Sequence, residues 1–240
     1  MENYTSFPVP ARALVITPHP DDSELGCGGA VVTWIKQGTE VVYLLCTNGD
    51  KGSSDPEMTS PKLAELRKIE QQKAAEILGV LEVVRLDYED GSLEDTPFFR
   101  GQIVKVIRRF KPDVVLFTDP LRTGFYLHRD HRMCGQVLLD AAFPFARDRL
   151  HYPEHLTEES LQTHKVADIL FWGAEDIDTY IDITDSINQK ITSLEKHASQ
   201  VGSDIGKYLK DSSMRTASKW ESKDSSVVYA EGFRRVQIRR

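Results

Sequence analysis

Thr17-Pro18-His19-Pro20-Asp21-Asp22-Ser23-Glu24 follows directly on the apolar run Ala13-Leu14-Val15-Ile16, and this junction decides the fold. The apolar run is short and continuous, as is typical of a strand that is buried on both faces of a sheet. Pro18 and Pro20 end the strand, so the imidazole and carboxylates around them lie at its carboxyl end. Ligands bind at that position in open α/β sheets. We therefore expect the functional site to be built around this turn.

The alternation of buried strands and amphipathic helices continues outward from this turn. Apolar runs predict further strands over 41–46, 82–86 and 113–118, and apolar residues at helical spacing predict helices over 25–37, 61–78 and 96–110. A fourth helix is expected to end near Ala142. Such alternation with short connections favours parallel strands joined by right-handed crossovers. The predicted fold is α/β: a Rossmann-like, open, mostly parallel sheet with helices on both faces, whose strand-end loops share one edge.

The last part of the chain, 165–240, is less regular. Strands are expected over 166–172 and 180–183, and a helix over 184–197. The polar segment 211–226 is typical of a loop, and the pattern over 233–238 is typical of an edge strand. No linker of distinctive composition separates these segments from the rest of the chain. We therefore expect a single domain over 1–240.

Composition restricts the classes of partner. The chain has 240 residues, is 40% hydrophobic and 28% charged, and carries a formal net charge of −7, which disfavours nucleic acid and anionic lipid as partners. No run approaches the roughly 18 apolar residues of a membrane span, and the N-terminus lacks the pattern of an export signal. Cys27, Cys46 and Cys134 are odd in number and lie among apolar residues, which favours buried thiols over disulfides. We expect a cytoplasmic protein.

The turn contains half of a metal site. His19 and Asp22 are three residues apart, a spacing that lets both side chains reach one point. A catalytic zinc ion takes three protein ligands of the His, Asp or Glu type and leaves a fourth position for water. His131, in preference to His128, could supply the third ligand from the loop after the fourth strand. Asp21 would then remain beside the metal for proton transfer.

Simpler explanations compete with this interpretation. An Asp-Asp pair after a strand often only caps the following helix. The run Gly26 to Gly29 has some likeness to the glycine turn of nucleotide-binding folds, but it lies beyond the expected strand-to-helix turn, where glycines would instead allow close packing. Cys27 is expected in the core. The remaining histidines are expected at the surface: His151, His155, His164 and His197.

The motifs together resemble those of the zinc-dependent deacetylases of the LmbE/PIG-L family, whose members remove acetyl groups from N-acetylglucosamine units. The resemblance begins with His19-Pro20-Asp21-Asp22, continues through Glu24-Leu25-Gly26, and includes His128-x-Asp130-His131. It covers most of the chain, because further matching positions follow in the second helix, after the third strand and near the end of the chain: Arg67, Glu70, Asp90-Gly91, Asp182-Ile183-Thr184 and His197-x-Ser199-Gln200. Pro18 and Arg129 depart from the most frequent pattern.

The resemblance implies a role for each residue. It implies that His19, Asp22 and His131 bind zinc and that Asp21 is the general base. Further roles follow for residues that would face the substrate: His128 and Tyr126 on the developing oxyanion, and Arg67 and Asp90 on the sugar. Asp130 is expected to lie behind the metal ligands and to orient a neighbouring histidine by a hydrogen bond. The resemblance also implies a homo-oligomer, often a hexamer.

Two kinds of alternative remain open at this point. The same zinc site could hydrolyse a different small acyl amide, such as that of another amino-sugar conjugate. A metal-binding or nucleotide-binding module without hydrolysis is the second kind. The resemblance implies a small amino-sugar substrate, and the sequence does not identify the group attached to that sugar.

Overall fold

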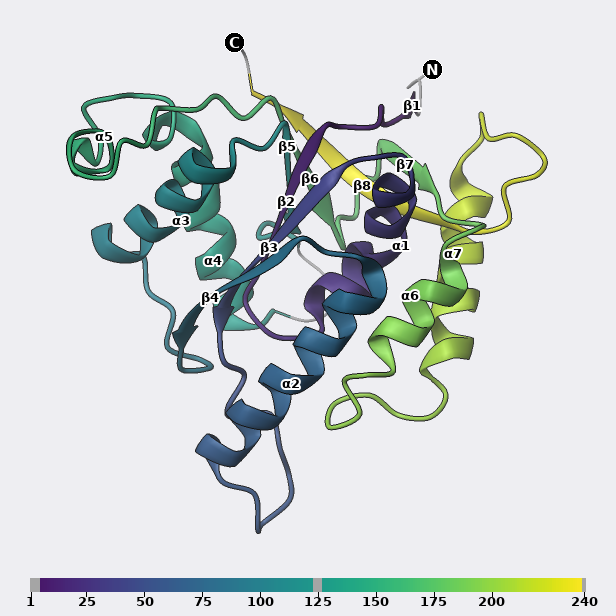
Figure 1. Ribbon diagram of the computed structural model, residues 1–240. Helices are drawn as coiled ribbons and strands as arrows, with labels where there is room; N and C mark the ends of the chain where they lie inside the picture. Colours follow the sequence, from purple (N-terminus) through teal and green to yellow (C-terminus); the bar gives the residue numbers. More distant parts are fainter. Residues whose placement is uncertain (1–4, 123–126, 239–240) are drawn as a thin grey trace.

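The computed structural model describes residues 5–122 and 127–238. Within these ranges, the strands form one sheet in the order β1-β7-β8-β6-β5-β2-β3-β4 (Figure 1). Five consecutive strands of that order run parallel: β2 (Arg12–Thr17), β3 (Glu40–Thr47), β4 (Glu82–Tyr88), β5 (Val114–Thr118) and β6 (Asp168–Trp172). The others are β1 (Thr5–Ser6), β7 (Thr179–Asp182) and β8 (Ala230–Gln237), and β8 is antiparallel to both its neighbours.

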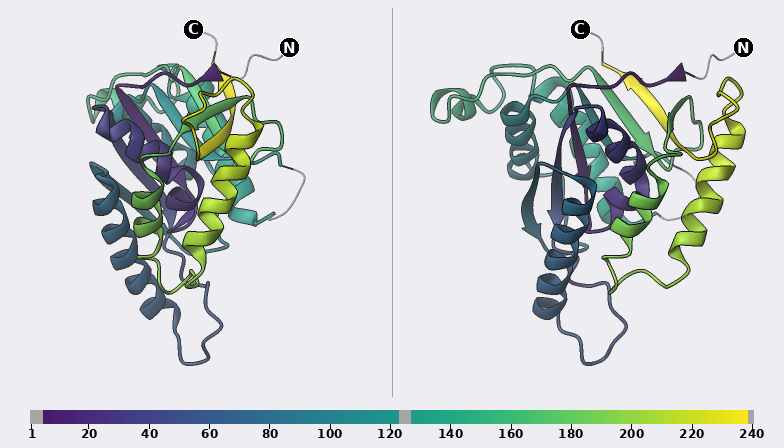
Figure 2. Two further views of the ribbon diagram at one scale, coloured as in Figure 1. Left: turned by 90° about the vertical axis from the view of Figure 1, so that its right-hand side faces the viewer. Right: turned by 45° about the vertical axis from the view of Figure 1, so that its right-hand side comes forward.

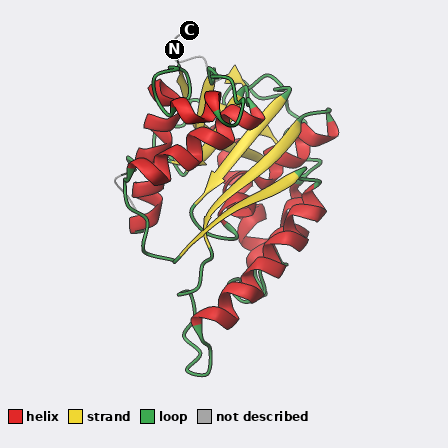
Figure 3. Cartoon of the chain, turned by 60° about the vertical axis from the view of Figure 1, so that its left-hand side comes forward, coloured by secondary structure: helices red, strands yellow, loops and turns green. Residues whose placement is uncertain are grey.

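Helices cover both faces of the sheet (Figures 2 and 3). One face packs against four helices: α1 (Asp22–Lys36), α2 (Ser60–Leu78), α6 (Ile187–Leu194) and α7 (Ile205–Lys219). The other face packs against α3 (Pro97–Phe110) and α4 (Arg129–Asp140). A π-helical turn, η1 (Ala141–Phe145), and the short helix α5 (Pro153–Thr157) follow α4. The prediction of a mostly parallel α/β sheet covered by helices is confirmed.

The sheet divides the core into two layers, and β2 contributes side chains to both. Ala13 and Val15 pack on the α1 side of the sheet, whereas Leu14 and Ile16 pack on the α3 and α4 side. All four are fully buried. Side chains alternate between the faces of a strand, and burying a Val, Leu or Ile side chain stabilises the fold by about 2 kcal/mol. This burial fixes the strand, and therefore fixes where the turn that follows it lies.

The prediction of a loop over 211–226 is wrong for most of that segment, because α7 extends to Lys219. The buried face of α7 consists of Leu209, Ser213 and Ala217, which recur at every fourth residue. Two of these three side chains are small, so the apolar periodicity that identifies a helix is weak here. The helix α6 is also shorter than the predicted span of 184–197.

The prediction that 233–238 forms an edge strand is wrong as well. The strand β8 lies between β6 and β7 inside the sheet. The arginines of this segment are typical of a strand with an exposed edge, but in the structure they form ion pairs. Arg234 contacts Asp119 at 2.8 Å, and Arg235 contacts Asp168 at 2.7 Å. Paired arginines can therefore occupy a central strand whose sequence alone indicates exposure.

The cysteines agree with the expectation of buried thiols. Cys27, Cys46 and Cys134 are buried and form no disulfide, although the Sγ atoms of Cys46 and Cys134 lie 3.4 Å apart. No helix within the described residues combines the length and the apolar character that crossing a membrane requires.

Candidate active site

The turn between β2 and α1 is held in a defined conformation. Asp21 has a left-handed backbone with φ of 90°, which aspartate tolerates better than most residues, and α1 begins at the next residue. The backbone amide of His19 donates to a carboxylate oxygen of Asp22 at 3.0 Å. Below the turn, the amide and hydroxyl of Thr47 both donate to the carbonyl of Pro18, at 2.8 and 2.7 Å. The turn is thus fixed from β3 as well as from its own side chains.

Three of the predicted side chains converge on one point. Nδ1 of His19 lies 3.3 Å from Nε2 of His131 and 3.4 Å from Oδ2 of Asp22, and Nε2 of His131 lies 3.3 Å from Oδ1 of Asp22. All three residues are buried. His131 comes from the first turn of α4, which begins beyond the end of β5. The two parallel strands β2 and β5 are neighbours, which brings these distant parts of the sequence together.

The second nitrogen of His19 faces carboxylates. Nε2 lies 3.2 Å from Oδ2 of Asp130 and 3.0 Å from Oδ1 of Asp90. Asp130 is fully buried and accepts hydrogen bonds from the backbone amides of Gly91 and Leu93, at 2.6 and 3.2 Å. It is therefore held rigidly enough to orient the imidazole of His19, leaving Nδ1 directed at Asp22 and His131.

His128 lies beside this group at the start of α4. Its Nδ1 atom accepts a hydrogen bond from the backbone amide of Asp130 at 3.2 Å, and its Nε2 atom lies 3.7 Å from Asp90. The imidazole rings of His128 and His19 meet edge to face, with centroids 4.5 Å apart. About a third of the His128 side chain is exposed, so it is accessible in a way that His19 and His131 are not. Tyr126, the other predicted oxyanion contact, lies outside the described residues.

Burial and charge give the converging residues different protonation states. Burial alone would lower the pKa of His19, but hydrogen bonds with three carboxylates, that of Asp130 foremost, raise it to about 12. Burial lowers the pKa of His131 to about 4 against the opposing effect of Asp22. Burial would raise the pKa of Asp22, but the two histidines lower it to about 2. The surroundings of His19 thus favour a cation, while Asp22 stays ionised and His131 stays neutral.

Asp21 lies next to this group in the sequence and contacts Arg67 of α2. A guanidinium nitrogen of Arg67 donates to Oδ2 of Asp21 at 3.0 Å and to the carbonyl of Pro20 at 2.6 Å, and the other terminal nitrogen donates to the carbonyl of Gly49 at 3.0 Å. Arg67 is only 4% exposed. The role of Arg67 as a sugar contact stays a prediction. Its hydrogen bonds place the guanidinium group against the turn. Burial and the neighbouring carboxylate of Asp22 raise the pKa of Asp21 to about 7, although Arg67 opposes them.

A buried network behind the turn was not predicted. Glu24 is fully buried, accepts a hydrogen bond from the side-chain amide of Gln71 at 3.0 Å, and lies 3.4 Å from Nε2 of His197. The side-chain oxygen of Gln71 also accepts from the backbone amide of Asp21 at 3.2 Å. The prediction that His197 lies at the surface is therefore wrong. The family-like segment around His197 was the only signal in the sequence that could have indicated this.

His155 is also buried, contrary to the prediction, and its ring stacks on that of Tyr152 with the ring centroids 5.4 Å apart. His151 and His164 are half-buried. The glycines after the turn lie inside α1 and not in a strand-to-helix turn. A methyl group on Gly29 would meet Ile183 at 2.8 Å, which supports close packing as the reason for this glycine.

A cleft of about 630 Å³ reaches the site. Asp21, Asp22 and His131 line one end of it. Its other walls come from the end of β6, from α7 and from the start of β8, and they include Trp172, Tyr208 and Glu231. The cleft lies beyond the carboxyl ends of the parallel strands, where the sequence predicted the ligand.

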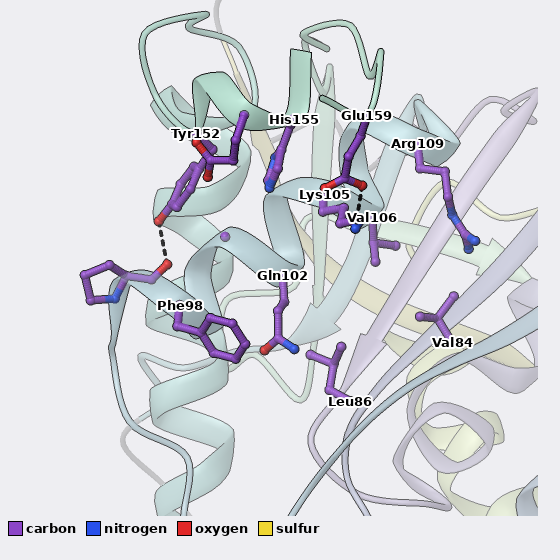
Figure 4. Close-up of a pocket in the computed structure, with 13 residues that line it drawn as sticks. Val84, Leu86, Phe98, Gln102, Lys105, Val106, Arg109, Tyr152, His155 and Glu159 are labelled. Carbon is purple, nitrogen blue, oxygen red and sulfur yellow. Dashed lines mark hydrogen bonds and ion pairs between the residues drawn. The ribbon is translucent and has the colours of Figure 1, made fainter. Parts of the chain in front are cut away.

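A separate pocket of about 490 Å³ lies between α3, β4 and the α5 segment (Figure 4). Val84 and Leu86 of β4 and Phe98 of α3 give it an apolar lining. Lys105 and Glu159 form an ion pair of 2.5 Å at its edge (Figure 4). None of the predicted site residues that the structure describes lines this pocket, so it is distinct from the candidate active site.

Comparison with known proteins gives consistent results. The model of the PIG-L family, described as GlcNAc-PI de-N-acetylase, matches residues 14–142, which is more than half of the chain. A diacetylchitobiose deacetylase from Thermococcus kodakarensis is 33% identical over 223 residues, which cover 93% of this chain and 82% of the relative. A mycothiol S-conjugate amidase from Streptomyces coelicolor is 30% identical over 180 residues, which cover 65% of this chain and 59% of the relative.

A solved structure is also similar along nearly the whole chain. The N,N'-diacetylchitobiose deacetylase from Pyrococcus horikoshii superposes with a TM-score of 0.86 at 28% sequence identity, covering 95% of this chain and 84% of that one. The matched family region contains the turn after β2, the strand β5 and His131. The chain therefore belongs to the PIG-L family of de-N-acetylases.

Proposed function

We propose that this protein is a zinc-dependent hydrolase that removes the N-acetyl group from an N-acetylglucosamine-type amino sugar or its conjugate. The observation that carries the proposal is the convergence of His19 Nδ1, Asp22 and His131 Nε2 beside Asp21, in a cleft at the carboxyl ends of the strands. Membership of the PIG-L family and the names of its relatives support the reaction and the class of substrate.

The converging residues fit a zinc ion. Two imidazole nitrogens and one carboxylate, all buried, are the ligand types that catalytic zinc uses. Asp22 is ionised and His131 is neutral, as metal ligands must be. The raised pKa of His19 favours a cation in the absence of the metal, so His19 would release its Nδ1 proton on binding zinc and keep the Nε2 proton that it donates to Asp130. When bound there, zinc would supply a water of lowered pKa and polarise the acyl carbonyl.

The residues of the chain divide the remaining chemistry between them. Asp21, with a pKa of about 7, is matched to accept a proton from water at neutral pH and to return it to the leaving amine. His128, which is partly exposed beside His19, would face the oxyanion of the tetrahedral intermediate, with Tyr126 as a further contact. Asp90 lies next to both histidines and would contact the sugar.

A second candidate substrate is a different small acyl amide on the same site. The cleft of about 630 Å³ has room for more than an acetyl group, and the similarity to a mycothiol S-conjugate amidase favours testing this class. We further propose that the protein acts as a homo-oligomer, with the hexamer as the size that the family resemblance implies, and that it is cytoplasmic.

The test is a panel of substrates incubated with zinc-loaded protein. Release of acetate from N-acetylglucosamine, N,N'-diacetylchitobiose and an N-acetylglucosaminyl glycoside is measured, beside amine release from the same sugars with longer acyl groups. We expect acetate release from at least one acetylated sugar that stops after chelation and returns with zinc. Amine release only from the longer acyl amides would favour the second candidate, and no release from any of them would contradict both.

A further inference from the structure

The middle of α1 is bonded to a residue far away in the sequence. The backbone amides of Gly29 and Ala30 donate to the two carboxylate oxygens of Glu231 in β8, at 2.9 and 2.7 Å. In a regular helix these amides pair with the carbonyls four residues earlier, those of Leu25 and Gly26. A carboxylate that accepts from consecutive helix amides is the arrangement of a helix N-terminus, here in the interior of a helix.

The carbonyl of Leu25 is also bonded outside the helix. Nζ of Lys190 in α6 donates to it at 2.8 Å, and the same atom forms an ion pair with Oε1 of Glu231. One ion pair from α6 and β8 thus supplies an acceptor to Gly29 and Ala30 and a donor to Leu25. The side chains of Lys190 and Glu231 are only 3% and 5% exposed.

α1 packs closely against Lys190 and Ile183 at its glycines. A methyl group on Gly28 would lie 3.4 Å from Cγ of Lys190, and one on Gly29 would overlap Ile183. Burying two charges is costly, and a well-packed apolar pair often gives equal or greater stability. An ion pair in this position therefore calls for a role other than stability alone.

The location of the ion pair indicates that role. The first turns of α1 carry Asp22, and they are joined to the rest of the helix at Leu25, where Lys190 is bonded. Both charged residues also line the cleft that reaches Asp22 and His131. Movement of the first turns of α1 would move the carboxylate of Asp22 relative to His131, which comes from a different helix.

We propose that Lys190 and Glu231 are positioning residues for the metal site: their ion pair sets the place of Asp22 through the backbone of α1. The consequence for catalysis rests on the proposed function, but the consequence for metal binding does not. The described bonds of the pair reach neither His19 nor His131. They reach the backbone of α1 at Leu25, Gly29 and Ala30, so α1 is the bonded connection between the pair and Asp22.

The experiment compares the double variant Lys190→Gln/Glu231→Gln with the single variant Glu231→Gln. The double variant removes both charges together and so leaves no unpaired charge in the interior. It therefore keeps the proposal testable if the single variant fails to fold. Arg108→Met is the matched control, because Arg108 is fully buried on the other face of the sheet and bonds backbone carbonyls such as that of His151. Zinc affinity is measured by competition with a chromophoric chelator, together with Tm, kcat and KM.

We expect the double variant to bind zinc about ten-fold to a hundred-fold more weakly, and to lose kcat with little change in KM. Arg108→Met should lower Tm but keep the zinc affinity of the wild type. The proposal is overturned if the double variant only loses Tm, as the control does, and keeps wild-type zinc affinity. Absence of deacetylation in the wild type would contradict the proposed function alone, because zinc affinity would still decide the positioning role.

Discussion

Nε2 of His19 lies 3.2 Å from Oδ2 of Asp130, so the imidazole that faces the candidate metal position is held from behind by a buried carboxylate. The two residues are 111 positions apart in the sequence and meet because β2 and β5 are neighbours in the sheet. Partners of this kind fix the tautomer and the orientation of a metal-binding histidine. The contact therefore joins the two histidine motifs directly, in addition to the metal that both motifs are proposed to bind.

Replacement of Asp130 by Asn should weaken metal binding. The asparagine can no longer accept from His19 and from both backbone amides of the Gly91 to Leu93 segment, so His19 loses its fixed orientation. We expect zinc affinity to fall by about ten-fold to a hundred-fold. Asp211→Asn, which removes an exposed carboxylate on α7, is the control and should bind zinc like the wild type. Equal affinity in both variants would exclude the orienting role of Asp130.

Variants of Arg67 should separate positioning from sugar binding. Arg67→Lys keeps the charge but cannot bond Asp21, Pro20 and Gly49 together, so Asp21 should lose its place. We expect kcat to fall about ten-fold or more with KM nearly unchanged, and Tm to fall. Lys68→Met, at the exposed neighbouring position, should have no effect. A raised KM with unchanged kcat would instead support the predicted sugar contact.

His131 and His128 are distinguished by metal content. His131→Ala should lose zinc, whereas His128→Ala should retain it and lose turnover, because only His131 points Nε2 at Asp22 and Nδ1 of His19. Zinc should raise the Tm of the wild type and of His128→Ala by favouring the folded state, and should not do so for His131→Ala. Full zinc occupancy of His131→Ala, measured by elemental analysis, would disprove its role as a ligand.

His197 should make stability depend on pH. Burial alone would lower its pKa, but Glu24 raises it above the ordinary value of 6.5. The contribution of His197 to stability is therefore fully present below pH 6.5 and is lost as pH rises through the folded-state pKa. His197→Gln should remove this loss, which is measured as the free energy of unfolding in urea between pH 5.5 and 9.

His164 provides a control of opposite sign. Burial lowers its pKa below 6.5. Its contribution to stability is therefore fully present above pH 6.5 and is lost as pH falls from 6.5 through the folded-state pKa. His164→Gln should flatten the acid side of the same curve and leave the alkaline side unchanged. If His197→Gln instead alters only the acid side, the interaction of His197 with Glu24 has been assigned incorrectly.

Much of the fold could be predicted because local sequence decides it. The run Ala13 to Ile16 is apolar throughout, and the helices after it have regular apolar spacing, so parallel pairing followed from the alternation. The meeting of His19 with His131 also followed, since strand-end loops share one edge of a parallel sheet. In these elements local preference and tertiary structure agree.

The remaining features depend on contacts that sequence spacing does not contain. β8 is central because Arg234 and Arg235 find carboxylates on neighbouring elements. His197 is buried because Glu24, far away in the sequence, provides a partner for it. The bonds from Lys190 and Glu231 to the backbone of α1 join three separate segments, and no pattern within any one of them predicts the other two.

The most direct test of the account is acetate release by Asp21→Asn compared with the wild type at equal, measured zinc occupancy. If Asp21 is the general base beside a metal held by His19, Asp22 and His131, the variant should keep its zinc and lose about 10² to 10⁴ in kcat. Turnover close to that of the wild type in the zinc-loaded variant would contradict the assignment of Asp21 and the division of roles between the two aspartates.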